Sequence, residues 1–148
     1  VGLHALPVER AILEGLDSLR SSVILALPYS EAGGDMDSGP ILGLSPPVAV
    51  DLRGAGLEEL RACAAGRPAK RPGTGFGDRL EEVARWNLEN LKTHGDWIVL
   101  PRVVVDFARG SFARDGAHLA FRMSGRWVPI QTVLYGPDSR EIVLREPV

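Results

Sequence analysis

Apolar residues at the start of the chain follow a helical spacing and then an extended one. After Pro7 they recur every three or four positions, at Val8, Ala11, Ile12, Leu16 and Leu19. This spacing predicts an amphipathic helix that breaks at Ser21-Ser22. The next run, Val23 to Leu27, is continuous, short and bounded by Pro28, which is typical of a strand buried on both faces.

A second strand and a second helix follow a pair of prolines. Pro46-Pro47 leads into Val48 to Val50, which we expect to form an edge strand because proline donates no hydrogen bond to a sheet. Gly54-Ala55-Gly56 predicts a turn after this strand, and a helix follows near residues 57–65.

A third helix is indicated by its N-terminal cap. Residues 66–77 are rich in glycine, proline and basic residues and predict a loop. Asp78 followed by Glu81 has the spacing of a capping box, which predicts a helix running to about Thr93. We expect Asn87, on this helix, to be solvated or to cap the backbone, not to act in catalysis.

Near the C-terminus, apolar and polar residues alternate, which is typical of strands. The alternation covers residues 119–123, a turn follows at Ser124-Gly125, and extended runs cover residues 127–135 and 142–144. These features predict a small β-meander that packs on the α/β part of the chain. Pro129 favours an edge position for its middle strand.

Composition indicates a globular α/β protein without extreme charge. The 148 residues are 45% hydrophobic and 24% charged, with a formal net charge of -2. The absence of a dense basic block argues against nucleic acid as the main partner, although Arg67 to Arg71 forms a small basic cluster. The single Cys63 cannot form an internal disulfide, and no metal-ligand set or membrane span is visible. We therefore expect a cytoplasmic protein.

The most informative segment is the glycine-rich acidic stretch from Gly34 to Leu42. Its glycines permit a close approach of the backbone to a ligand, and Pro40 restricts the backbone where the segment leads into Ile41-Leu42. Because the segment follows a predicted strand, Asp37 is a candidate proton carrier at a cleft. The alternative interpretation is a surface turn, which the same residue types also form.

Within this stretch, Asp37-Ser38-Gly39-Pro40-Ile41 resembles the Asp-x-Gly-x-Ile loop of the folate-dependent formyltransferases. That family includes the glycinamide ribonucleotide and methionyl-tRNA formyltransferases. Further segments follow in the family's order over roughly residues 3 to 110. Leu3 to Pro7 is similar to a shortened His-Pro-Ser-Leu-Leu-Pro loop, and Arg10 to Gly15 is similar to an Ala-Ile-x-x-Gly helix. His94 to Gly110 is similar to a late helix that carries Pro101 in its first turn and ends in Ala-x-Gly.

The resemblance implies transfer of a formyl group from 10-formyltetrahydrofolate to a small-molecule amine. Asp37 would move protons and His4 would stabilise the oxyanion of the tetrahedral intermediate. The residues implied to bind the cofactor are Gly34, Asp35, Met36 and Gly39. Gly2 stands where the family's Asn-x-His pair has its asparagine.

The implied fold is a partial formyltransferase-like open sheet with flanking helices over residues 1–117, plus a C-terminal β-meander over residues 118–148. In the family a Rossmann-like half precedes the histidine loop, so we expect a homo-oligomer or a partner chain to complete the site. Two alternatives stay open. They are a non-catalytic binding or assembly module with this fold, and a formyl hydrolase in which water replaces the amine.

Other chemically versatile residues have structural interpretations. His94 lies at a predicted helix end, where an imidazolium favours the helix dipole. His118 opens a strand and has no candidate partner in the sequence. We expect Trp86, Trp97 and Trp127 to be core or interface anchors.

Overall fold

The computed structural model describes residues 5–28 and 39–147, which form a mixed α/β fold. The chain divides into two compact units, each built from two segments of sequence. The helical unit takes its residues from Val1–Leu19 and Pro47–Thr93, and the sheet unit from Arg20–Pro46 and His94–Val148. The boundary expected between residues 117 and 118 lies inside the sheet unit, at a turn between two of its strands.

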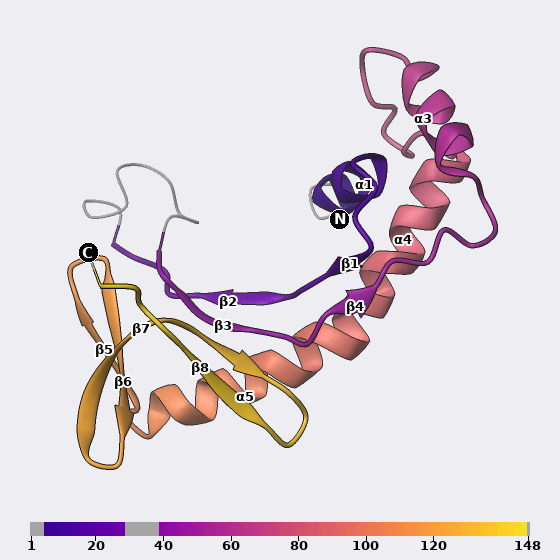
Figure 1. The fold of residues 1–148 in the computed structure, drawn as a ribbon. Helices are drawn as coiled ribbons and strands as arrows, with labels where there is room; N and C mark the ends of the chain where they lie inside the picture. The colour runs from indigo at the N-terminus through magenta and orange to yellow at the C-terminus, as the bar shows by residue number, and fades with distance from the viewer. Residues whose placement is uncertain (1–4, 29–38, 148) are drawn as a thin grey trace. The chain divides into compact units, whose positions relative to one another are not determined.

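The helical unit contains three helices and a short two-stranded sheet (Figure 1). Its elements are α1 (Ala5–Leu13), β1 (Ser18–Leu19), β4 (Val48–Ala49), α3 (Leu57–Ala65) and α4 (Arg79–Leu91), with β1 and β4 antiparallel. Apolar residues of the helices form its core: Val8, Ile12, Leu60, Leu80, Val83 and Ala84. The strand at Val48 and the helix at Leu57–Ala65 confirm the sequence prediction.

The first helix is shorter than its apolar spacing predicts. It ends at Leu13, and Gly15 takes a left-handed φ of 78°. The amide of Gly15 donates to the carbonyl of Ile12 and that of Leu16 to Ala11, which together form a Schellman cap. The predicted continuation to Leu19 is therefore wrong, because Gly15 allows the chain to reverse and Leu19 to enter β1.

Asp78 caps α4 as predicted, although Glu81 does not complete a capping box, and Asn87 bonds to the backbone and is not solvated. The carboxylate of Asp78 accepts the amide of Glu81 at 2.9 Å. Asn87 is buried, and its side chain accepts the amide of Asp51 at 2.9 Å and donates to the carbonyl of Asp51 at 2.8 Å. Because a buried amide side chain needs such partners, Asn87 fixes the segment after β4 to α4.

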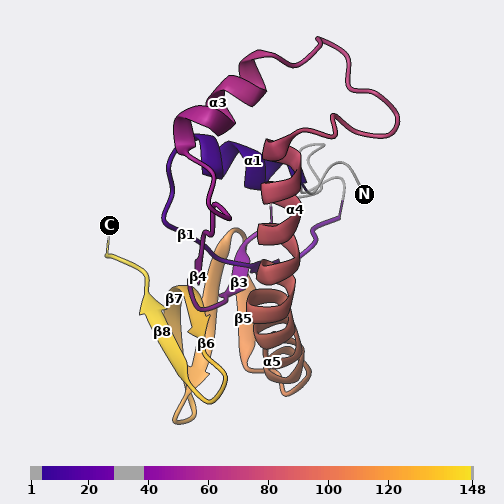
Figure 2. The ribbon, with the colours of Figure 1, turned by 90° about the vertical axis from the view of Figure 1, so that its right-hand side faces the viewer.

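The sheet unit is a curled six-stranded mixed sheet with one helix packed on it (Figures 1 and 2). Its strands are β2 (Ser22–Ile24), β3 (Ile41–Leu44), β5 (Phe112–Asp115), β6 (His118–Met123), β7 (Arg126–Tyr135) and β8 (Arg140–Leu144). The order is β2-β3-β7-β6-β5, with β8 also paired to β7. Only β3 and β7 are parallel among the described strands. Val99 and Val103 of α5 (Trp97–Ala108) pack against Tyr135 and other buried strand residues.

Helix α5 and the meander β6-β7-β8 confirm the sequence prediction, but two strand positions were predicted wrongly. Strand β2 lies at a sheet edge with alternating exposure, so it is not buried on both faces. Strand β7 is central, although it contains Pro129. Pro129 is opposite Ala120 of β6, and the pairing of β7 with β8 begins only at Ile130.

Three further expectations concern individual side chains and the membrane. Trp86, Trp97 and Trp127 are exposed, Trp97 by 70%, so none is a core anchor. His94 lies inside a π-helical turn, η1 (Lys92–Asp96), and not at a helix end. In the part of the chain that the structure describes, no helix has the length and apolar character needed to cross a membrane.

Candidate functional site

The aspartate segment predicted from the sequence connects β2 to β3. Four residues of the segment with a proposed role lie outside the described residues: Gly34, Asp35, Met36 and Asp37. His4, the proposed oxyanion-stabilising residue, also lies outside them. Gly39 is described, and it directly precedes the Pro40-Ile41 entry into β3. The structure therefore defines the two strands that flank the segment and the surface at its exit.

Gly39 occupies a position that no larger residue fits. A Cβ atom placed on Gly39 would lie 1.7 Å from the carbonyl oxygen of Leu25. The amide of Leu25 donates to the carbonyl of Pro40 at 3.0 Å, so the chain is held tightly where it leaves β2 and enters β3. The glycine of the Asp-x-Gly motif is thus required here by a close backbone approach.

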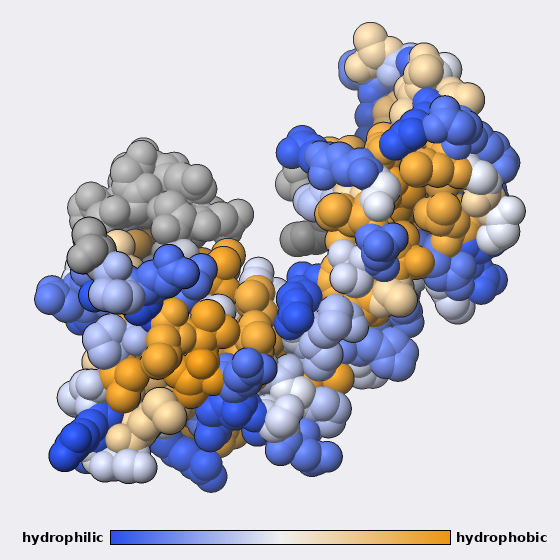
Figure 3. Space-filling view, viewed as in Figure 1, coloured by the Kyte–Doolittle hydropathy of each residue, from blue (hydrophilic) through white to orange (hydrophobic). Residues whose placement is uncertain are grey.

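A pocket of about 400 Å³, the strand-end pocket, opens beside Gly39. Its lining comes from the entry into β3, the start of β6, the bulged part of β7 and the residue after β8. The residues are Gly39, Pro40, Ile41, Leu44, Ala117, His118, Leu119, Ile130, Gln131, Thr132 and Arg145. An apolar wall with a few polar groups is the usual character of a small-molecule site. Apolar residues also gather on the face over β7 and β8 (Figure 3).

The polar groups of this pocket come from distant parts of the sequence. Thr132 is 7% exposed, and its hydroxyl is buried without a hydrogen-bond partner among the described residues. His118 and Arg145 are exposed at the same pocket. His118 was considered from the sequence and left without a partner, whereas nothing in the sequence pattern marked Thr132 or Arg145.

A second group of polar side chains, the carboxylate–guanidinium cluster, lies in the helical unit. Arg67 donates to both oxygens of Asp78, at 2.7 and 2.8 Å, and to both oxygens of Glu9, at 2.8 and 3.1 Å. Its guanidinium also lies 4.1 Å from the centre of the Phe76 ring. Arg71 lies 3.5 Å from the carboxylate of Glu81. These carboxylates pair with Arg67 and Arg71 of the basic cluster seen in the sequence, which argues against phosphate binding by these two arginines.

The hydrogen bonds of this cluster shift two pKa values. The bonds from Arg67 hold the pKa of the Asp78 carboxyl below its usual range, because they favour its charged form. The bonds to Asp78 and Glu9 raise the pKa of Arg67. The pairing therefore favours the charged forms of Asp78 and Arg67, and it holds the 66–77 loop against α1 and the start of α4.

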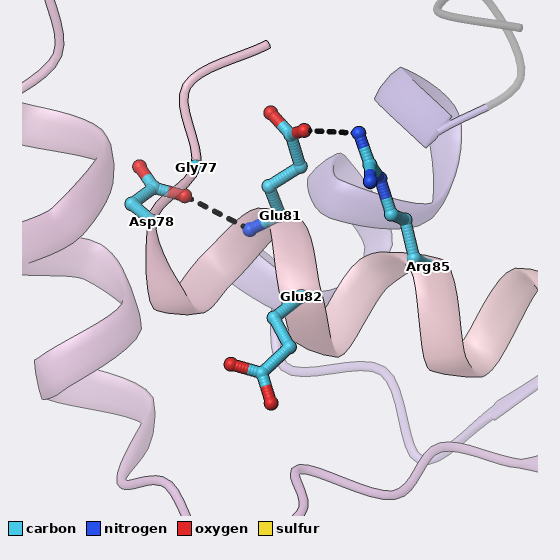
Figure 4. Close-up of a pocket in the computed structure, with 5 residues that line it drawn as sticks. All are labelled: Gly77, Asp78, Glu81, Glu82 and Arg85. Carbon is cyan, nitrogen blue, oxygen red and sulfur yellow. Dashed lines mark hydrogen bonds and ion pairs between the residues drawn. The ribbon is translucent and has the colours of Figure 1, made fainter. Parts of the chain in front are cut away.

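A shallow pocket of about 300 Å³ borders this cluster (Figure 4). Figure 4 shows Asp78 directed at the amide of Glu81, and Glu81 directed at Arg85, while Glu82 points away. Glu81 also accepts the amide of Phe76 at 2.7 Å. The Asp78 side chain accepts the amide of Glu81, the Glu81 side chain accepts the amide of Phe76, and both carboxylates also pair with arginines. This pocket therefore has a structural explanation.

A third polar group lies inside the sheet unit. Asp106 of α5 is buried and accepts hydrogen bonds from the Tyr135 hydroxyl at 2.7 Å and from Arg140 at 2.6 and 2.9 Å. Burial, together with the bond to Asp106, raises the pKa of the Tyr135 hydroxyl. Every oxygen of Asp106 has a donor, so these residues fix α5 to β7 and β8 and offer no open site.

The described residues contain no cluster of three or more His, Cys, Asp or Glu that could hold a metal ion. Comparisons of the chain with models of protein families, with curated proteins and with solved structures find no match. The strand-end pocket is therefore selected as the candidate site on geometry alone: it adjoins Gly39 and contains polar groups that nothing in the described fold uses.

Proposed function

We propose that this chain is a formyltransferase-like protein, which transfers a formyl group from 10-formyltetrahydrofolate to a substrate amine. The observation that carries the proposal is the place of the Asp-x-Gly-x-Ile segment. It joins β2 to β3, its glycine stands where a side chain cannot, and a pocket of about 400 Å³ opens at the C-terminal end of the segment. A surface turn alone would need neither the close approach nor the pocket.

The types of the flanking elements also support the proposal. Helix α1 covers Arg10 to Leu13 of the segment that resembles the Ala-Ile-x-x-Gly helix, and Gly15 caps it. The helix also includes Ala5 to Pro7, which the resemblance assigns to a loop. Strand β2 stands where the resemblance places a strand before the aspartate loop. Helix α5 ends at Ala108, directly before Arg109-Gly110, as the resemblance implies, but Pro101 is its fifth residue and not in its first turn, so that detail of the resemblance is wrong. The order of helix, strand, aspartate segment and late helix therefore agrees with the order that the resemblance implies.

In the proposed reaction, the amine nitrogen attacks the formyl carbon and a tetrahedral intermediate with an oxyanion forms. Asp37 accepts the proton that the amine loses, and His4 donates a hydrogen bond to the oxyanion. The bond between the formyl carbon and the folate nitrogen then breaks, and that nitrogen receives the proton.

The test is turnover of 10-formyltetrahydrofolate in the presence of amines, with the Asp37→Asn variant. An isosteric amide cannot accept the proton, so turnover should fall about a hundredfold or more while stability changes little. Asp138→Asn, which removes an exposed carboxylate in the turn between β7 and β8, is the matched control and should keep full turnover. Equal turnover in both variants would contradict the role of Asp37. Formate release without any amine would identify a hydrolase.

One observation favours the second candidate function, an assembly module without catalysis. Trp97, Leu100, Val104 and Phe107 share one face of α5, and each is at least half exposed. Such an uncharged stripe at helical spacing is suited to packing against an identical stripe in a two-fold dimer. In this alternative the chain associates with a second copy through the α5 stripe.

Sedimentation tests this alternative with two neighbouring substitutions on α5. Val104→Glu places a charge in the stripe and should yield monomers. Val105→Glu is the matched control, because Val105 is also exposed but lies about a quarter of a turn outside the stripe. Monomers for the unaltered chain at high concentration, or equal effects of both substitutions, would rule out association through the stripe.

A further inference from the structure

The β6–β7 hairpin turns at an end of the sheet unit that is rich in arginine. Arg122 of β6 is opposite Trp127 of β7, and Ser124-Gly125 forms the turn between the two strands. The amide of Arg122 donates to the carbonyl of Ser111 at 2.9 Å, so the end of α5, just before Ser111, lies at the same end of the sheet unit (Figures 1 and 2). Five side chains here form the hairpin-end patch: Arg109, Arg122, Met123, Arg126 and Trp127.

The hairpin-end patch combines positive charge with exposed apolar side chains. The guanidinium groups of Arg109, Arg122 and Arg126 are exposed and form no hydrogen bond or ion pair with other residues that the structure describes. Met123 is 42% exposed and Trp127 is 49% exposed. The guanidinium of Arg122 lies 6.0 Å from the centre of the Trp127 ring. The charge of the three arginines is therefore available to a partner.

Acidic residues on the neighbouring strand and helix do not offset this charge. Asp115 of β5 is opposite His118, which begins β6, so Asp115 lies about 13 Å along the strand from the patch. That separation exceeds the Debye length of about 8 Å at physiological salt. The carboxylate of Asp106 on α5 is buried and paired with Arg140. Gly39, which follows the aspartate segment, lines one pocket with His118 and so lies at the opposite end of β6 from the patch.

The shape and composition of the patch favour a lipid surface as its partner. Guanidinium groups bind phosphate, and a tryptophan ring prefers the headgroup level of a bilayer. Five side chains are far fewer than the about 20–30 residues that each partner buries in a specific protein interface. Sites for single-stranded nucleic acid stack successive bases on several aromatic rings, whereas this patch has one. A bilayer requires neither a large matched area nor a second ring.

We propose that the hairpin-end patch binds the surface of an anionic lipid bilayer. Trp127 and Met123 lie at the headgroup level, and the three arginines contact lipid phosphates. Each basic residue near such a surface strengthens binding by about fivefold, so three arginines give about a hundredfold preference for anionic over neutral lipid. This is a peripheral contact. It goes beyond formyl transfer, because it rests on the hairpin and not on Asp37.

The test is co-sedimentation of the full chain with vesicles that contain phosphatidylserine and phosphatidylcholine in equal parts, compared with vesicles of phosphatidylcholine alone. The chain should bind the anionic vesicles about a hundredfold more tightly. Arg126→Gln should weaken this binding about fivefold, and Arg122→Gln combined with Arg126→Gln about thirtyfold. Arg145→Gln is the matched control, because it removes the same charge beside His118, at the opposite end of β6. It should bind like the unaltered chain.

Tryptophan fluorescence locates the contact on the molecule. The emission of the chain should shift to shorter wavelength when anionic vesicles are added, because the Trp127 ring leaves water. Trp127→Phe keeps an aromatic ring in β7 and should abolish the shift. Trp86→Phe is the matched control, because Trp86 of α4 is similarly exposed, by 44%, and it should keep the shift.

Equal binding to the two kinds of vesicle, or binding to neither, would overturn the proposal. So would equal losses in Arg126→Gln and Arg145→Gln, or a fluorescence shift that persists in Trp127→Phe. Binding of a single-stranded oligonucleotide that depends on Arg122 and Arg126, without vesicle binding, would overturn it in favour of nucleic acid. None of these results measures turnover of 10-formyltetrahydrofolate, so the formyltransferase proposal stands or fails separately.

Discussion

The guanidinium of Arg67 donates to both carboxylate oxygens of Asp78, while the same carboxylate caps α4 through the amide of Glu81. One aspartate therefore serves as a helix cap and as the acceptor for the arginine that holds the 66–77 loop. Arg67 also binds Glu9 of α1, which is only 4% exposed. Breaking one member of such a pair leaves an uncompensated buried charge, so the cluster links the stability of α1, the loop and α4.

This arrangement predicts a loss of stability in acid. The folded-state pKa of Asp78 is lowered, so its contribution is fully present above the unfolded pKa of about 3.9 and is lost as the pH falls toward the folded value. Asp78→Asn should keep the helix cap, because asparagine is also a good N-cap residue. Its free energy of unfolding at neutral pH should be lower by about 2 kcal/mol, because the charged hydrogen bonds to Arg67 are lost. Urea unfolding at pH 7 and below pH 4 measures both effects. If the difference in free energy of unfolding between Asp78→Asn and the unaltered chain is as large below pH 4 as at pH 7, the pKa of Asp78 is not lowered by Arg67.

Tyr135 should show the opposite dependence on pH. Burial and the bond to Asp106 raise its folded-state pKa, so the contribution is present below the unfolded pKa of about 10 and is lost as the pH rises above it. The chain has two tyrosines, and Tyr135→Phe removes one of them. Because the raised pKa keeps the Tyr135 hydroxyl protonated in the folded protein, Tyr135 contributes no phenolate absorbance before unfolding. The unaltered chain and Tyr135→Phe should therefore give the same phenolate absorbance as the pH is raised, until the protein unfolds. A smaller native-state signal in the variant would mean that Tyr135 ionises freely.

The same Tyr135→Phe variant should be destabilised by about 1–2 kcal/mol at neutral pH, because one hydrogen bond to a buried charge is lost. Arg140 keeps both of its hydrogen bonds to Asp106, which limits the effect.

Gly39 and Gly73 form a matched pair for testing the close approach at the exit of the aspartate segment. A Cβ at Gly39 would collide with the backbone of Leu25, whereas a Cβ at Gly73 would meet nothing within 4 Å. Gly39→Ala should cost more than about 2 kcal/mol, or abolish folding of the hairpin, whereas Gly73→Ala should be neutral or slightly stabilising. Thermal unfolding of both variants measures this. Similar effects at the two positions would show that the backbones at Gly39 and Leu25 are not held together.

Elements defined by short-range signals were predictable from the sequence. The cap pair Asp78 and Glu81 located the start of α4, and the glycine before Leu57 located α3. The turn at Ser124-Gly125 located the β6-β7 hairpin, because both residues adopt positive φ there. In each case the determining residues are within a few positions of one another.

Long-range pairing was not predictable in the same way. Gly43 pairs with Val133 across about ninety residues, and a Cβ at Gly43 would collide with Val103 and Tyr135. Neither partner is marked locally in the sequence, so the parallel pairing of β3 with β7 and the central position of β7 were missed. Strand β5 was missed as well, because Phe112 to Asp115 is too short for a clear alternation.

The candidate site shows the same limit. Gly39 and the acidic segment were selected from a local motif, which is visible in the sequence. The association of His118, Thr132 and Arg145 depends on the curl of the sheet, because each comes from a different strand or strand end. Only His118 carried a chemical signal of its own, and it had no partner in the sequence to identify it.

The most direct test of the proposed function is a calorimetric titration of the chain with 5-formyltetrahydrofolate, a stable analogue of the proposed donor. The collision at Gly39 excludes Gly39→Val as a clean probe, so Asp37→Asn is compared with Asp138→Asn. The proposal predicts saturable binding that is weakened in Asp37→Asn and unchanged in Asp138→Asn. Absence of binding at millimolar ligand, or equal binding in all three proteins, would contradict a folate site at the aspartate segment.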